Sequence, residues 1–301
     1  MAGKYGSSAL WERYSRTHIT DESVTDLTGF KSTETNFKLA LWDPRPNGIR
    51  YLKALIFDLA DRLSPSAMAA LRRIPNRDVG DPITVRVSGE AVCLDYLQAV
   101  LELEFIGDHL DLGGATVLEI GAGYGRTCHA ILSNHEVAQY HIVDLDNSLR
   151  LATAYLRAVL TDEQFAKLRF SAVDDLEATL SGNRYDLCIN VDSFAEMDSE
   201  IVLNYLDLID RTCRHFYVKN PVGKYLDKSL DSHSQGDELV SMALRTGLLR
   251  EVIDIHDSQA VADQAQKFIA AYRPSLRWTG LADARAIPWS YYWQALYRCD
   301  R

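Results

Sequence analysis

The chain has 301 residues, and its 42 acidic residues outnumber its 32 lysines and arginines, which gives a formal net charge of −10 at pH 7. A hydrophobic fraction of 47% is typical of globular proteins and excludes a disordered or collagen-like chain. No apolar run approaches the ~18 residues that a membrane helix needs, so we expect no membrane partner. The acidic balance also argues against nucleic acid as a partner, because phosphate binding needs a basic face.

The cysteines and the N-terminus indicate a cytoplasmic protein. Five cysteines are scattered along the chain with no CxxC pair, which argues against a disulfide framework and against a structural metal site. The first residues lack the apolar core of a secretory signal. We therefore expect a cytoplasmic protein that holds no structural metal.

The first 110 residues read as mainly helical. Apolar spacing predicts helices over Tyr51–Leu63 and Glu90–Leu110, with a short extended piece at Pro82–Val87 between them. We assign residues 1–110 to a helical region that covers the substrate or pairs two subunits, and residues 111–301 to a cofactor-binding domain. A homodimer is one arrangement that such a helical region allows.

From Ala115 onward, short apolar strands alternate with helices. The predicted strands are Thr116–Ile120, Tyr140–Val143, Leu168–Val173, Tyr185–Asn190, Phe216–Lys219, Glu251–Ile255 and Tyr291–Tyr297. The predicted helices are Arg126–Ser133, Ser148–Val159, Ser199–Arg211, Gly236–Thr246 and a stretch around Ala260–Ala271. This alternation predicts an α/β fold with a doubly wound, mostly parallel sheet and an antiparallel C-terminal edge strand.

A glycine loop follows the first strand of this domain. In Val117–Thr127, a buried strand runs into Gly121, Gly123 and Gly125, and a helix then begins. Glycines at the carboxyl end of a parallel strand let a ligand approach the backbone. No GxxxxGK[ST] follows, which excludes a phosphate loop. The third position of a dinucleotide GxGxxG motif would be Arg126, which disfavours NAD.

Acids at the ends of the following strands complete the predicted cofactor pocket. Asp144 ends the second strand about 20 residues after the glycines, where a carboxylate accepts from ribose hydroxyls, and Asp146 is its rival. Asp174 follows the third strand and is placed to accept from an adenine amino group. The predicted cofactor-binding residues are Glu119, Gly121, Ala122, Gly123, Asp144, Leu145, Asp174, Asp175 and Asn190.

Several strings resemble one enzyme family. Glu119, Gly121, Gly123 and Gly125 match the E/DxGxGxG signature of class I S-adenosylmethionine (SAM)-dependent methyltransferases. Within that family, LEIGAGYGRT, YHIVDLDNSLRLATAYL, NVDSFAEM and FYVKNPVGKY resemble the sugar O-methyltransferase group, although Asp146 stands where that group has a proline. The resemblance implies SAM as the methyl donor and S-adenosylhomocysteine (SAH) as the product.

Candidate catalytic residues lie after the fourth and fifth strands. Glu196 is our first choice for a general base, Asn220 for a hydrogen-bond donor to the acceptor, and His233 for an alternative base on a polar loop. Each also has a purely structural interpretation: Glu196 as an acid that holds its loop, Asn220 as a turn residue before Pro221, and His233 as part of a solvated loop. Asp192 either positions a ligand or caps the next helix. Trp289 begins an aromatic cluster that either packs in the core or holds a sugar ring or a sulfonium.

We therefore expect a SAM-dependent methyltransferase of a small molecule, with O-methylation of a sugar or sugar-like metabolite in natural-product biosynthesis as the favoured reaction. An N- or C-methyltransferase of an aromatic or amino-acid-derived product is the alternative. A non-catalytic SAM-binding subunit and an oxidoreductase are further alternatives, and Arg126 disfavours the oxidoreductase.

Overall fold

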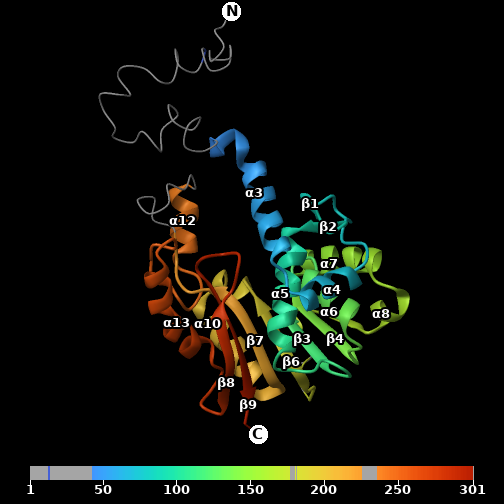
Figure 1. Ribbon diagram of the computed structural model, residues 1–301. Coiled ribbons are helices and arrows are strands. Elements are labelled where there is room, and N and C mark those ends of the chain that lie inside the picture. Colours follow the sequence, from blue (N-terminus) through green and yellow to red (C-terminus); the bar gives the residue numbers. More distant parts are fainter. Residues whose placement is uncertain (1–12, 14–42, 177–179, 181, 226–235, 301) are drawn as a thin grey trace, which may run out of the picture. The chain divides into compact units, whose positions relative to one another are not determined.

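A computed structural model of the chain describes residues 13, 43–176, 180, 182–225 and 236–300 (Figure 1). The chain divides into two compact units, residues 1–58 and 59–301. Helix α3 (Pro44–Asp61) begins in the first unit, and all other named elements belong to the second. The role of residues 1–110 as a lid or a dimerisation region stays a prediction. Within the described ranges, no helix is both long enough and apolar enough to cross a membrane.

The second unit is built on a seven-stranded sheet with the order β5-β4-β3-β6-β7-β9-β8. Its strands are β3 (Thr116–Ile120), β4 (Gln139–Asp144), β5 (Leu168–Ala172), β6 (Tyr185–Val191), β7 (Cys213–Pro221), β8 (Trp278–Arg285) and β9 (Tyr292–Cys299). The first five are parallel, whereas β9 pairs antiparallel with both β7 and β8. The predicted fold class is confirmed.

Helices connect the parallel strands and cover the sheet. The helices that the structure describes in this unit are α4 (Pro65–Arg73), α5 (Leu94–Gly107), α6 (Arg126–Asn134), α7 (Asp146–Val159), α8 (Asp162–Ala166), α10 (Ser199–Thr212), α12 (Asp237–Ala243) and α13 (Ser258–Tyr272). In Figure 1, α5 and α6 lie on one side of the sheet, and α10 and α13 on the other. The chain runs outward from β3 to β5 and returns to β6 on the other side of β3, so the strand order reverses at the β3/β6 crevice, where open α/β sheets bind ligands.

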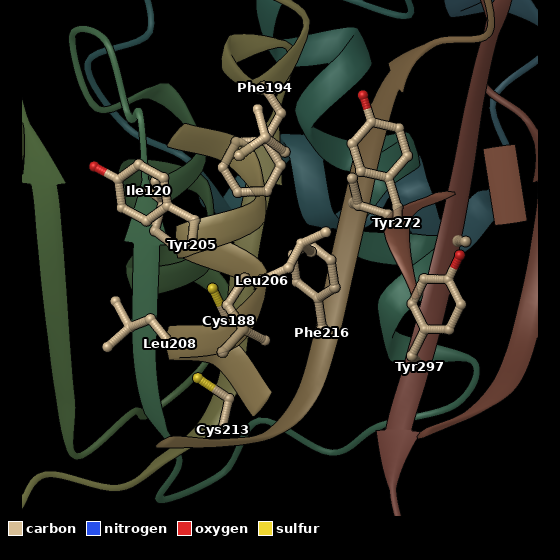
Figure 2. Close-up of a cluster of buried hydrophobic side chains, with 14 of the residues drawn as sticks. Ile120, Cys188, Phe194, Tyr205, Leu206, Leu208, Cys213, Phe216, Tyr272 and Tyr297 are labelled. Atoms are coloured by element: carbon tan, nitrogen blue, oxygen red, sulfur yellow. The ribbon is translucent and has the colours of Figure 1, made fainter. Parts of the chain in front are cut away.

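An aromatic cluster forms the core between the sheet and the helices α10 and α13 (Figure 2). Phe194 is fully buried at its centre, with ring centroids 5.7 Å from Tyr205 and 6.3 Å from both Phe216 and Tyr272. Phe194 belongs to the 3₁₀ turn η2 (Ser193–Ala195), which directly follows β6. The core therefore fixes the loop at the carboxyl end of β6.

The opposite face of the sheet holds a buried ion cluster. The Glu102 carboxylate on α5 accepts from Arg126 Nη2 at 2.9 Å and from Lys219 Nζ on β7 at 2.8 Å. Glu102 and Lys219 are 3% and 2% exposed, so solvent screens their attraction little. Burial raises the pKa of Glu102, but the charges of Arg126 and Lys219 outweigh this effect and hold that pKa below its ordinary value. The cluster ties α5, α6 and β7 together.

The predicted helix Glu90–Leu110 is wrong in its first turn. Residues Thr84–Val87 (β1) and Glu90–Cys93 (β2) form an antiparallel hairpin, and α5 begins only at Leu94. The turn residues Ser88 and Gly89 both have positive φ, 50° and 85°. Such a two-residue turn matches the twist of a hairpin and favours strand pairing over helix.

The C-terminal part also differs from the prediction. Glu251–Ile255 forms no strand, only a parallel bridge between Lys224 and Val252, because β9 already occupies the free edge of β7. The predicted last strand exists as β9, but it lies inside the sheet. The edge strand is β8, which the sequence did not reveal because Gly280 and a bulge interrupt its pattern.

The buried ion cluster predicts a large loss of stability in the variant Glu102→Gln. The substitution leaves Arg126 and Lys219 buried beside a neutral amide. Removing one partner of a buried ion pair typically lowers the free energy of unfolding by about 3–5 kcal/mol. Urea unfolding measures the difference. The matched control is Glu251→Gln, which breaks an exposed pair with Lys267 and is expected to change the free energy of unfolding little, because solvent screens that pair. Equal losses in both variants would contradict this interpretation.

Candidate active site

A cavity of about 1180 Å³ opens at the β3/β6 crevice. Its wall comes from the loops that follow β3, β4, β5 and β6, and from helices α5 and α10. Of the predicted site residues, the cavity brings together Glu119, Gly121, Ala122, Gly123, Asp144, Leu145 and Glu196. The volume exceeds the ~300–1,000 Å³ typical of ligand pockets, so it has room for two small molecules side by side.

Two of the three loop glycines are required by the packing of the protein itself. A Cβ on Gly121 would lie 2.1 Å from Ser193 Oγ, and one on Gly125 would lie 2.8 Å from a methyl group of Leu156. Both residues also have positive φ, 74° and 96°. These glycines let the turn η2 and helix α7 approach the loop closely.

Gly123 differs, because a Cβ there would meet no protein atom within 4 Å. Its φ of 58° lies in the left-handed region, and it lines the cavity. Its amide donates to Asp144 Oδ2 at 2.9 Å. The space over Gly123 is therefore open to a ligand, which is the feature that a glycine cradle provides.

Asp144 is fixed at the end of β4 by two backbone bonds. One carboxylate oxygen accepts from Gly123 N, and the other accepts from Leu145 N at 2.7 Å. A carboxylate has about four acceptor sites, so capacity for ligand hydroxyl groups remains on a side chain that lines the cavity. Asp146, the rival acid, is the first residue of α7 and does not line the cavity.

Glu119 lies at the cavity floor and is 2% exposed. Its Oε2 accepts from the hydroxyl group of Tyr140 at 2.8 Å. Burial raises the pKa of Glu119 to about 7, although the Tyr140 hydrogen bond and the charge of Arg126 act in the opposite direction. Arg126 itself is bound by Glu102, so Glu119 is a buried acid without an ion pair of its own in the described structure.

Of the two predicted adenine acids, Asp174 does not line the cavity. Asp174 and Asp175 lie in the 3₁₀ turn η1 (Val173–Asp175) after β5, and Asp174 is exposed. The flanking apolar residues Val173 and Leu176 line the cavity instead. The wall at this end of the cavity is therefore apolar and suits the face of a flat ring.

Asn190 and Asn220 are fully buried and support the site from behind. Asn220 Nδ2 donates to Asn190 Oδ1 at 2.8 Å, and Asn190 Nδ2 donates to Ile120 O at 3.0 Å and to Ser193 Oγ at 2.7 Å. Asn220 Oδ1 accepts from Ala195 N at 3.1 Å. Neither amide lines the cavity, so both hold the loop after β6 rather than face a ligand.

The loop after β6 presents Asp192 and Glu196 to the cavity. Partial burial raises the pKa of Glu196, the negative charge of Asp192 raises it further, and Lys224 lowers it. Lys224 Nζ donates to Ala195 O at 3.0 Å and to Thr246 Oγ1 at 3.2 Å, and Gly247 N donates to Met197 O at 2.7 Å. The segment around Thr246 thus holds the loop from outside.

His233 lies outside the described residues, so its role stays a prediction. Among the residues that are described, no group of three or more histidine, cysteine or acidic side chains is arranged to hold a metal ion.

The cavity also contains residues that the sequence did not point to. Asp95 and Gln98 come from α5, and Asn204 and Arg211 from α10. No local motif marks these residues, because only the fold brings the two helices to the crevice. Trp289 also lines the cavity, which favours the ligand-facing interpretation of this residue.

Comparisons with solved structures identify the fold. The structure is similar to the methyltransferase domain of bacterial CtHen1-C, with a TM-score of 0.50 and 10% identity, covering 68% of this chain and 97% of that domain. It also matches the magnesium protoporphyrin IX methyltransferase of Synechocystis with bound SAH, with a TM-score of 0.44 and 13% identity, covering 68% of this chain and 82% of that one. A further match is a SAM-dependent methyltransferase of Aquifex aeolicus, with a TM-score of 0.41 and 12% identity, covering 66% of this chain and 89% of that one. Neither a protein-family model nor a curated protein matches the chain. The chain has the Rossmann-like methyltransferase fold.

The raised pKa of Glu119 predicts how stability depends on pH. The folded-state pKa of about 7 lies above the ordinary value of 4.5. The contribution of Glu119 to the free energy of unfolding is therefore fully present below pH 4.5 and is lost as the pH rises through 7. We expect the free energy of unfolding to fall by roughly 3 kcal/mol more in the wild type than in Glu119→Gln between pH 4.5 and 8. Urea unfolding across this range measures the difference, with the exposed Glu163→Gln as the control. Parallel profiles of wild type and Glu119→Gln would refute the assignment.

Proposed function

We propose that the protein is a SAM-dependent methyltransferase of a small-molecule acceptor. The observation that carries the proposal is the cradle made by Gly123 and Asp144, in which the glycine leaves open space and the acid, bound to its amide, retains acceptor sites. Bound SAM supplies a methyl group on a positively charged sulfur. The residues Glu119, Gly121, Ala122, Gly123, Asp144 and Leu145 would hold it.

The chemistry of each cavity wall fits the parts of SAM. Asp144 suits the ribose hydroxyls, and the apolar residues Val173 and Leu176 suit the adenine face. Glu119, an acid without an ion pair among the described residues, suits the ammonium group of the methionine portion. The acceptor would lie beside Glu196 and Trp289. Arg126, which is bound to Glu102, occupies the position at which a dinucleotide-binding loop needs a small residue. This supports SAM over NAD as the ligand.

For the acceptor, we propose a hydroxyl group of a sugar or sugar-like metabolite in natural-product biosynthesis, in the cytoplasm. Glu196 supports O-methylation, because an aliphatic hydroxyl needs a base to remove its proton. Its carboxylate lies at the cavity wall with a raised pKa, so it binds a proton more readily than an ordinary glutamate. An amine or an activated carbon, the acceptor of an N- or C-methyltransferase, needs less help from a base, and the intact cradle argues against a non-catalytic subunit.

The cradle predicts that Gly123→Val abolishes SAM binding, because its side chain would fill the open space of the loop. Isothermal titration of SAM and NAD into the folded wild type is expected to show binding of SAM alone. Gly89→Val is the matched control, since Gly89 also has positive φ and open space around its Cβ but lies on the β1–β2 hairpin. We expect this control to bind SAM normally. A folded wild type that fails to bind SAM would overturn the proposal.

The base role predicts the behaviour of Glu196→Gln. Screening of hydroxylated metabolites by mass spectrometry, with SAM present, is expected to reveal an acceptor that gains one methyl group. With that acceptor, Glu196→Gln should lower kcat by about 10²–10⁴-fold, the usual contribution of a general base, and leave the Kd of SAM unchanged. The wild-type rate should rise with pH as Glu196 ionises. Full turnover by the variant would exclude Glu196 as the base.

A further inference from the structure

The cavity has two chemically different ends. Asp144 follows β4, on one side of the central strand β3, whereas Asp192 and Glu196 follow β6, on the other side. Gly121 lies between them and is close enough to Ser193 that no Cβ fits there. A ligand that crosses the glycine loop with its ribose at Asp144 therefore directs its other end toward Asp192.

The cavity wall is strongly acidic. Among the described residues of the wall, six are acidic and two are arginines, Arg126 and Arg211. The acids are Asp95, Glu119, Asp144, Asp192, Glu196 and Asp207. Both arginines are paired, Arg126 with Glu102 behind the wall and Arg211 with Asp207. The wall therefore carries an excess of negative charge, which favours a cationic ligand.

Asp192 is held in place more firmly than an ordinary surface acid. Its backbone has φ 71° and ψ −43°, a strained conformation for a residue with a side chain. Its amide donates to Lys219 O at 2.8 Å, and its Oδ1 accepts from the hydroxyl group of Tyr292 at 2.5 Å. Because a phenol is neutral, this bond orients the carboxylate without cancelling its charge. The burial of Phe194, two residues later, fixes the same loop.

Trp289 adds an aromatic side chain to the cavity wall. Aromatic rings attract cations through the negative potential of their faces. A fixed carboxylate and an indole on the wall of one cavity therefore both favour a positive charge.

We propose that Asp192, positioned by Tyr292, makes the cavity bind SAM more tightly than SAH and so promotes release of the product. This inference rests on the proposed function. Methyl transfer breaks the carbon–sulfur bond and leaves its electron pair on sulfur, while the methyl carbon bonds to the acceptor oxygen and the acceptor proton passes to Glu196. The sulfonium becomes an uncharged thioether, and its attraction to Asp192 is lost. Asp192 thus discriminates between SAM and SAH, whereas Glu196 accepts the proton of the acceptor.

The test compares the dissociation constants of SAM and SAH by isothermal titration, in the whole chain and without an acceptor. Asp192→Asn removes the charge and keeps the shape, so we expect the Kd of SAM to rise about fivefold, the effect of one partly exposed ion pair, with the Kd of SAH unchanged. Tyr292→Phe keeps the charge and releases the carboxylate, so the SAM preference should fall less. The charge-matched control is Asp263→Asn, on the exposed side of α13 outside the cavity wall, which should change neither constant.

The salt dependence of SAM and SAH binding tests the inference in the wild type, without any variant. The preference of the wild type for SAM over SAH should shrink as the salt concentration rises, because Asp192 is exposed and its charge is screened. An unchanged preference in Asp192→Asn, or a salt-independent preference in the wild type, would overturn this inference and leave the proposed function intact. Failure of the folded wild type to bind either ligand would overturn the proposed function itself.

Discussion

The candidate site depends on the burial of the Phe194 side chain. Its ring packs between Tyr205 of α10 and Tyr272 of α13, at the centre of the apolar core (Figure 2). Phe194 is separated by one residue from Asp192 and by one from Glu196, the two acids that face the cavity. The amides of Asn190 and Asn220 reinforce this anchor through hydrogen bonds to the same loop. Core packing, rather than the ligand, thus sets the positions of these acids.

The two faces of the sheet support the site by different means. On the face of α10 and α13 the support is apolar and aromatic, and it fixes the loop after β6. On the face of α5 and α6 it is ionic, because Glu102 binds both Arg126, at the start of α6, and Lys219 on β7. Charged groups held within the fold are costly unless paired, so this cluster requires a specific alignment of the helices with the sheet. The glycine loop lies between these two regions of support.

Much of the fold followed from local sequence patterns. The bounds of β3 are those predicted, and α6 differs by one residue, because the strand, glycines and helix form one continuous signal. Asp144 and Glu196 reach the cavity as predicted, since the carboxyl ends of parallel strands share one edge. The pairing of β8, the partnership of Asp192 with Tyr292 and the placement of Asp95 depend on contacts distant in sequence, and no local pattern encodes them. The sequence also could not predict that Asn190 and Asn220 are buried and support the loop. An asparagine at the end of a strand can equally contact a ligand or hold the backbone of a loop.

One contact links the site to the order in which the chain is synthesised. Tyr292 follows Asp192 by 100 residues, and it reaches that acid only from the start of β9. During translation, β3, the glycine loop, β4 and β6 emerge well before β9. A nascent chain thus contains Gly123 and Asp144 before it contains the phenol that positions Asp192. A ribosome that stalls before β9 would therefore leave Asp192 without the phenol that positions it.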